Sequence, residues 1–156
     1  MKITETYINI TERLSGLKDL PLFFIRLALA YGFYMPAMMK WGNIDGIAEW
    51  FGGMGIPFPT LNAYLAATTE MAAVILLPLG LATRIISIPL MITMVVAIVT
   101  VHLGNGFNAG DNGFEIPLYY LLMLLLLFFA GPGKISLDFL LKKIYLNIGR
   151  RGKRLG

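Results

Sequence analysis

The chain alternates four long apolar runs with short stretches that are polar or rich in glycine and proline. The runs lie at residues 20–40, 61–81, 85–103 and 115–131. At about 1.5 Å per helical residue, roughly 20 residues span the ~30 Å hydrocarbon core of a bilayer. Each run is therefore predicted to be a transmembrane helix, and the last one is short, so we expect it to tilt little.

The segments that flank these runs have a different, amphipathic pattern. Residues 3–17 and 136–148 each place apolar side chains at helical spacing on one face, which predicts helices lying on the membrane surface, with Ser136 as an N-cap. Residues 41–60 contain too many glycines and prolines to span a membrane, but their aromatic residues suit an interface. The predicted fold class is an all-α integral membrane protein. Its four transmembrane helices form a bundle flanked by amphipathic interfacial helices, and residues 1–156 form a single domain.

Composition supports a membrane protein. Hydrophobic residues make up 57% of the chain and charged residues only 14%, whereas soluble domains carry about 25% charged residues. The charges are also segregated, because the apolar region between Pro21 and Gly131 contains only these: Arg26, Lys40, Asp45, Glu49, Glu70, Arg84, Asp111 and Glu115. The first twenty residues show no signal-peptide pattern, so we expect the first span to direct insertion.

The distribution of Lys and Arg predicts the topology. These residues flank the spans at the amino terminus, at Arg84 and in the carboxy-terminal tail, while the opposite side has only Lys40. We therefore expect a multi-pass protein of the cell inner membrane with both termini in the cytoplasm. The basic tail suits anionic lipid headgroups, and nothing in the chain indicates nucleic-acid binding.

Glu70 lies near the middle of the second run. An ionised group at the centre of a bilayer costs on the order of 3 kcal/mol or more, so this carboxylate needs a partner. Arg26, inside the first run, is predicted to supply it in a buried ion pair. Two alternatives remain open: Arg26 extends to the headgroups, or the pair serves only to assemble the helices.

A second polar group is predicted at the outer ends of the spans. Lys40 ends the first run, His102 ends the third, Glu115 begins the fourth, and Asp111 lies in the loop between the last two. These residue types could form a proton relay, an anionic-headgroup site or a quinone site. The alternative is that they are interfacial charges in water.

Copper is a second candidate cofactor. Met35, Met38 and Met39 fall at helical spacing, and thioethers together with the imidazole of His102 are ligands that copper(I) accepts. Methionine also fills gaps between helices, which is the alternative role for these residues. The chain has no cysteine, so disulfide, thiolate and iron–sulfur chemistry within it is excluded. No motif assigns catalytic residues, and whether the protein is an enzyme stays open.

Several of these residues together resemble the DoxX family of small four-helix membrane proteins. The resemblance covers residues 21–138 and rests on the order and spacing of these features: Arg26, Gly32 and Lys40 in the first span; Glu70 and the Gly-x-x-Thr-Arg of Gly80 to Arg84; Glu115 opening the fourth span; and Gly131 to Gly133 followed by Ser136 to Asp138.

The resemblance implies a membrane component of a redox system. DoxX relatives include subunits associated with thiosulfate:quinone oxidoreduction and with oxidoreductase complexes in thiol and oxidative stress. Three stretches, at residues 30–41, 48–70 and 100–120, resemble the branch found beside biosynthesis genes for copper-binding, ribosomally made modified peptides. We therefore expect peptide-modifying enzymes or oxidoreductase subunits as partners, and a homo-oligomer is compatible with the small size. A small transporter and an assembly factor are the alternatives.

Overall fold

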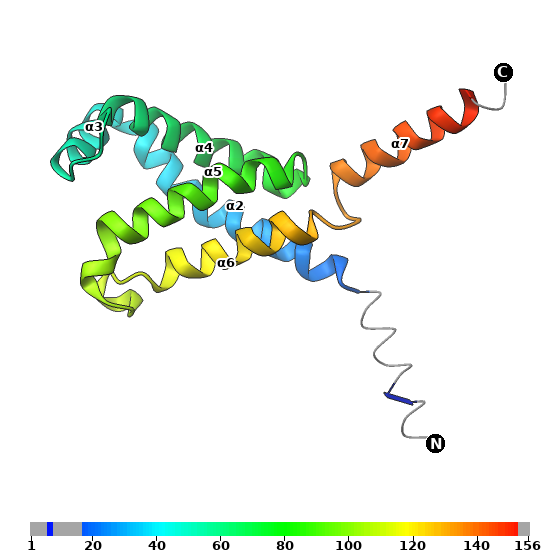
Figure 1. Cartoon of the computed structure of the whole chain (residues 1–156), viewed down its shortest axis with the longest axis horizontal. Helices are drawn as coiled ribbons and strands as arrows, with labels where there is room; N and C mark the ends of the chain where they lie inside the picture. The colour runs from blue at the N-terminus through cyan, green and yellow to red at the C-terminus, as the bar shows by residue number, and fades with distance from the viewer. Residues whose placement is uncertain (1–5, 8–16, 153–156) are drawn as a thin grey trace.

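The computed structural model describes residues 6–7 and 17–152, and that part of the chain is helical throughout apart from turns (Figure 1). Four long helices form the bundle: α2 (Asp19–Gly42), α4 (Pro59–Leu79), α5 (Thr83–Ala97) and α6 (Glu115–Ala130). A short helix, α3 (Ile44–Gly53), connects α2 to α4, and α7 (Leu137–Gly152) follows the bundle. The predicted all-helical fold class is confirmed.

Three of the long helices could cross a membrane on the basis of length and composition. They are α2, α4 and the continuous stretch Thr83–Asn105, in which α5 is extended by a π-helical turn (Ile98–His102) and a 3-10 turn (Leu103–Asn105). α6 is apolar but has only 16 residues, which is about 24 Å of helix. Its length agrees with the short fourth run seen in the sequence.

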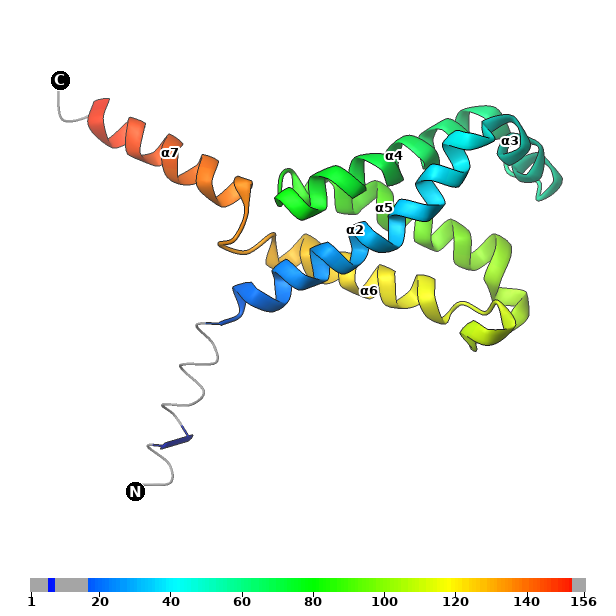
Figure 2. The ribbon, with the colours of Figure 1, turned by 180° about the vertical axis from the view of Figure 1, so that it is seen from behind.

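Consecutive long helices run in opposite directions, as both views show (Figures 1 and 2). α2 begins, and α7 leaves the bundle, at one end, which we call the terminal end. The opposite end carries α3 and residues 98–114, and we call it the loop end. α2 packs mainly against α4, while α5 packs mainly against α6. The charged groups of the bundle are therefore positioned chiefly by how α2 and α4 meet.

Small side chains line the contact between α2 and α4. The buried residues are Ala30 and Ala37 on α2, and Ala63, Ala67 and Ala73 on α4. Small residues let two helices approach closely, which favours dispersion contacts where lipid provides no hydrophobic driving force between helices. Larger apolar side chains complete the core around this contact, among them Leu29, Phe33, Leu77, Leu90, Leu124 and Leu127.

Gly32 provides a second close approach, between α2 and α6. A Cβ atom built on Gly32 would overlap the phenol of Tyr120, so the absence of a side chain creates the space for that ring. The ring of Tyr120 also packs edge-to-face on Phe33, with 5.4 Å between centroids. Gly32 thus fixes how closely α6 can approach α2.

Of the two surface helices predicted from the sequence, the structure describes only the second in full. Most of the helix predicted at residues 3–17 lies outside the described residues. The second one corresponds to α7, and the hydroxyl oxygen of Ser136 accepts a hydrogen bond from the backbone N–H of Phe139 at 3.2 Å. This is the geometry of an N-cap, as the sequence predicts.

Candidate functional site

Arg26 and Lys40 lie on the same face of α2. They are fourteen residues apart, which is close to four helical turns and about 21 Å along the axis. Between them the same face buries Ala30, Phe33 and Ala37. The face therefore carries one cation toward each end of an apolar stripe, and the two cations have different surroundings.

Toward the loop end, Lys40 forms an ion pair with Glu70. The ammonium nitrogen Nζ of Lys40 lies 2.8 and 3.0 Å from the two carboxylate oxygens of Glu70. The Glu70 side chain is only 3% exposed, and that of Lys40 is 16% exposed. Both carboxylate oxygens accept from the same cation, so the charge of Glu70 is compensated within the protein.

Trp41 follows Lys40 in the sequence and contacts α4 about one turn before Glu70. Its indole Nε1–H donates a hydrogen bond to the backbone oxygen of Ala67 at 3.2 Å, and its ring packs edge-to-face on Tyr64 at 6.0 Å. About half of the Trp41 side chain stays exposed on the outer surface of the bundle. A partly exposed aromatic ring therefore lies next to Lys40 in the chain and contacts α4 within about one helical turn of Glu70.

The Arg26–Glu70 ion pair predicted from the sequence is not formed. Glu70 bonds to Lys40, and Arg26 lies some 21 Å further along α2. Glu70 lies about 16 Å along α4 from the first residue of that helix, and it contacts Lys40 in the last turn of α2. The first turns of α4 therefore extend well past the end of α2. The segment that connects the two helices contains α3, which packs against α4. The prediction was wrong because it assumed that the two helices begin at the same level.

Arg26, toward the terminal end, is fully buried and bonds to backbone oxygens. Its Nη1 donates to the carbonyl oxygens of Leu77 at 3.1 Å and of Pro78 at 3.2 Å, and its Nη2 donates to that of Ile135. The guanidinium also lies over the ring of Phe23, 5.5 Å from the centroid. The last carbonyls of a helix carry partial negative charge, so the end of α4 suits a cation.

Asp138, in the first turn of α7, also lies at the terminal end and bonds to the turn that follows α4. Its carboxylate accepts hydrogen bonds from the backbone N–H groups of Ala82 at 2.9 Å and Thr83 at 3.2 Å, at the start of α5. Its own N–H donates to the oxygen of Gly80 at 3.1 Å. An anion at a helix N-terminus is favourable. Asp138 therefore fixes the beginning of α7 to the turn between α4 and α5.

Gly80 is required at this turn for two reasons. It ends α4 in the left-handed conformation, with φ of 63°, which side chains other than glycine rarely adopt. In addition, a Cβ atom there would overlap the Arg26 guanidinium and lie 2.5 Å from the Cβ of Ser136. Gly80, Arg26 and Asp138 thus pack as one unit, although they are far apart in the sequence.

The structure separates the predicted outer group into two parts. His102 Nδ1 lies 2.8 Å from the oxygen of Asn112, and the Asp111 carboxylate accepts from Asn108 at 3.1 Å. Glu115 accepts from the N–H of Ala109 and the hydroxyl of Tyr119, each at 3.1 Å. These bonds organise the loop before α6. Among the described residues, no hydrogen bond or ion pair joins Lys40 to this loop, because Lys40 is engaged with Glu70.

The three methionines of the predicted copper set lie exposed on the loop-end half of α2. The exposed fractions are 61% for Met35, 46% for Met38 and 67% for Met39. None of the contacts found in the described residues joins His102 to them; it faces Asn112 instead. Those residues also contain no group of three or more His, Asp or Glu that could hold a metal ion. The methionines alone therefore remain as candidate copper(I) ligands.

Comparison with known proteins identifies the family. The DoxX family model matches residues 21–103, which include Arg26, Lys40 and Glu70. The chain belongs to the DoxX family. An uncharacterised protein of Haemophilus influenzae is 35% identical over 128 residues, which cover 80% of this chain and 85% of that protein. No solved structure matches the chain.

Two further DoxX relatives have informative names. "Putative oxidoreductase CatD" of Bacillus subtilis is 30% identical over 122 residues, covering 77% of this chain and 86% of that protein. "Inner membrane protein YphA" of Escherichia coli is 31% identical over 122 residues, covering 75% of this chain and 87% of that protein. The second name, together with the DoxX family and the apolar helices, supports a membrane location for this chain.

Sequence reasoning missed two features of this DoxX site. It did not assign Trp41 to the surroundings of Glu70, and it did not connect Asp138 with Arg26 and Gly80. The helical spacing of Arg26 and Lys40 was an available signal, since it places both cations on the face that meets α4. The bonds of Asp138 had no such signal, because backbone N–H groups are present at almost every residue.

Proposed function

We propose that this DoxX protein is the membrane subunit of a redox system and that it meets a quinone headgroup at Lys40 and Glu70. The observation that carries the proposal is the ion pair itself: a carboxylate and an ammonium group 2.8 Å apart, nearly enclosed between α2 and α4, with a half-exposed indole next to Lys40 in the sequence. Ionisable groups within a membrane span are expensive, and they commonly mark functional sites.

The residue types match what quinone chemistry requires of a protein. An ammonium group can donate a hydrogen bond to a quinone carbonyl oxygen, and a carboxylate can take up or release a proton when the quinone changes oxidation state. Quinones dissolve in the bilayer, and the exposed side of Trp41 offers an aromatic surface facing that phase. The site can therefore receive a ligand from the lipid.

The electrons have to come from, or go to, another protein. The chain contains no cysteine, so a thiol relay or an iron–sulfur cluster within it is excluded. We infer that a partner oxidoreductase subunit carries the redox centre, while this chain provides the membrane anchor and the quinone contact. We also infer that both termini face the cytoplasm of an inner membrane, since α2 begins and α6 ends at the same, basic end.

Tryptophan fluorescence tests the quinone site directly. The chain has two tryptophans, so Trp50→Phe leaves Trp41 as the only one and Trp41→Phe leaves Trp50 as a matched, similarly exposed control. In lipid nanodiscs, quenching of Trp41 fluorescence by decylubiquinone should saturate as the quinone concentration rises. Quenching of Trp50 should instead increase in proportion to the quinone concentration without saturating. Glu70→Gln in the Trp50→Phe background should weaken the saturable phase about tenfold, the effect of losing ~1.4 kcal/mol of binding.

Two outcomes would overturn this proposal. One is quenching of Trp41 that never saturates and equals that of Trp50. The other is a solute or ion flux in proteoliposomes that Glu70→Gln abolishes while quinone has no saturable effect, which would support the transporter alternative instead.

A second candidate function rests on the exposed methionines. Met35, Met38 and Met39 present three thioethers within about a turn and a half of Lys40, and copper(I) favours such soft ligands. This would suit a membrane component for the maturation of copper-binding modified peptides. Purification from native membranes in mild detergent distinguishes the two functions, since the second predicts co-purification of peptide-modifying enzymes and the first of oxidoreductase subunits.

A further inference from the structure

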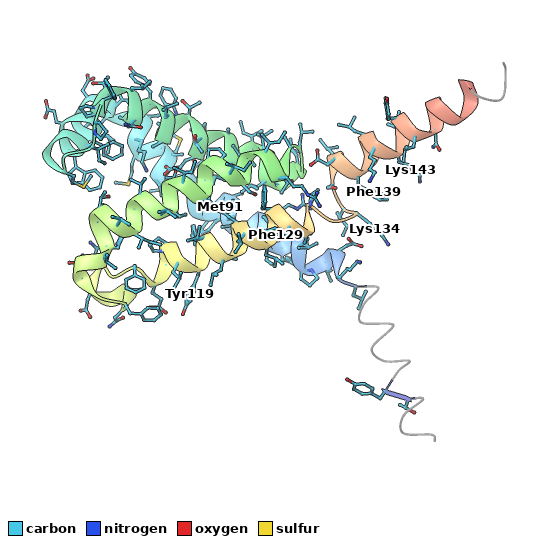
Figure 3. All side chains as sticks on the ribbon, viewed as in Figure 1. Met91, Tyr119, Phe129, Lys134, Phe139 and Lys143 are labelled. Atoms are coloured by element: carbon cyan, nitrogen blue, oxygen red, sulfur yellow. The ribbon has the colours of Figure 1, made fainter. Side chains whose placement is uncertain are left out.

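α7 stands clear of the bundle, although one of its faces is apolar. Figures 1 and 2 show it leaving the terminal end and running away from the other helices, and Figure 3 shows Lys143 on the part that stands clear. Four side chains at helical spacing, Leu137, Leu140, Leu141 and Ile144, form an apolar stripe, and each is between 37% and 54% exposed. Such a stripe on a short helix calls for an apolar partner.

The first turn of α7 is nevertheless held in place. Asp138 bonds to the N–H groups of Ala82 and Thr83 and to the oxygen of Gly80, all in the turn between α4 and α5. This turn lies at the level where the apolar spans α4 and α5 meet. The stripe therefore starts at the membrane boundary of the bundle, and the rest of α7 extends from that fixed point.

The charge around the terminal end is positive. Besides the buried Arg26, and Arg150 and Arg151 at the far end of α7, the described residues there include the exposed basic residues Lys18, Arg84, Lys134, Lys142 and Lys143 and the acidic residues Asp19 and Asp138. Both acids accept hydrogen bonds from backbone N–H groups, Asp19 from that of Lys134 at 2.9 Å. Lys142 and Lys143 are exposed and lie on α7 away from the apolar stripe. The ammonium of Lys134 also lies 3.8 Å from the Asp19 carboxylate, so among the side chains of α7 that the structure describes, the uncompensated positive charge is that of Lys142 and Lys143.

We propose that α7 binds the surface of an anionic bilayer, with the stripe Leu137, Leu140, Leu141 and Ile144 among the acyl chains and Lys142 and Lys143 at the headgroups. Charge complementarity favours this occupant, since a basic amphipathic helix next to a membrane boundary is attracted to anionic lipid by about 1 kcal/mol per basic residue. The Asp138 contacts set where on that surface the helix begins. A neutral bilayer would retain the apolar contact and lose the electrostatic one.

The absence of native cysteine allows a clean test with single-cysteine variants. Ile144→Cys places a probe on the apolar stripe, and Leu146→Cys, two residues later, places a matched probe on the opposite face of the same helix. Each variant is labelled with bimane and reconstituted in nanodiscs of phosphatidylcholine alone or with one-third phosphatidylglycerol. Quenching by lipids spin-labelled on the acyl chain then reports insertion of each probe.

The expected result is quenching at residue 144 that exceeds quenching at residue 146 by at least about twofold in the anionic discs. The difference in quenching between the two probes should be smaller in discs of phosphatidylcholine alone. It should also be smaller in anionic discs when Lys142→Glu and Lys143→Glu are combined, because the attraction is electrostatic. Equal quenching of the two probes, or quenching that does not depend on phosphatidylglycerol, would overturn the proposal. Burial of residue 144 only after a second membrane protein is added would also overturn it and assign the stripe to that protein.

Discussion

Arg26 and Lys40 lie on one face of α2, but their charges are compensated in different ways. The Arg26 guanidinium is fully buried and bonds to three backbone oxygens from α4 and the segment before α7. The Lys40 ammonium is slightly exposed and bonds to one side chain, Glu70. The first cluster joins three segments of the chain, whereas the second joins only two helices.

This difference separates a structural role from a functional one. Backbone oxygens cannot change protonation or move without unfolding a turn, so the Arg26 cluster is suited to holding the terminal end together. A carboxylate and an ammonium group can exchange protons and can rearrange toward a ligand. We therefore expect substitutions at Arg26 to affect stability first, and substitutions at Glu70 to affect function first.

Replacing Arg26 by leucine should have the largest effect on stability. The change leaves the oxygens of Pro78 and Ile135 without this donor, whereas the oxygen of Leu77 keeps the backbone N–H of Gly80 at 3.0 Å; each orphaned group that is buried costs about 1–3 kcal/mol. We expect a loss of at least ~3 kcal/mol in chemical unfolding in mixed micelles. Arg26→Lys should recover part of it, since one ammonium cannot reach all three oxygens. A leucine variant as stable as the parent would contradict the structural role.

Replacing Glu70 by leucine should cost less, about 2 kcal/mol. Removing one member of a buried pair is expensive because it leaves an uncompensated charge, but Lys40 is near enough to the surface to relax toward water. The double variant Lys40→Leu with Glu70→Leu should return to within ~1 kcal/mol of the parent, because an apolar pair removes both charges. It should still lack saturable quinone quenching. Simple addition of the two single losses would argue against a coupled pair.

Gly32 lies between the two clusters on α2 and provides a control for packing alone. Gly32→Ala should displace the Tyr120 ring and cost about 1–2 kcal/mol, as overpacking in a core does. The variant should keep saturable quenching of Trp41, because α4 and its contact with Lys40 are not involved. The double variant Gly32→Ala with Tyr120→Phe should recover part of the stability. Loss of quinone binding in the alanine variant would show that the pair depends on the position of α6.

His102→Ala should have the smallest effect. The imidazole makes one contact, with the oxygen of Asn112 in an exposed loop, and such a contact contributes about 1 kcal/mol or less. Quinone quenching at Trp41 should be unchanged, since Lys40 and Glu70 have no bond to this loop in the described part of the chain. A clear loss of saturable Trp41 quenching when this variant is titrated with quinone would show that His102 contributes to the site at Lys40 and Glu70.

The sequence alone determines the class of fold and the need for buried charge compensation. Four apolar runs of spanning or near-spanning length leave helices as the natural solution, because a bilayer offers no hydrogen bonds to an open backbone. Likewise, a carboxylate such as Glu70 inside an apolar run requires a partner wherever the helices lie. Both conclusions follow from local composition, and so does the N-cap at Ser136.

The tertiary structure alone decided which partner Glu70 has. The choice between Arg26 and Lys40 depends on how far α4 is shifted along α2, and no local pattern in the sequence encodes that shift. The compensation of Arg26 was equally hidden, because its acceptors are backbone oxygens at the end of α4 and before α7. Every residue carries such an oxygen, so only the three-dimensional arrangement determines which of them an arginine meets.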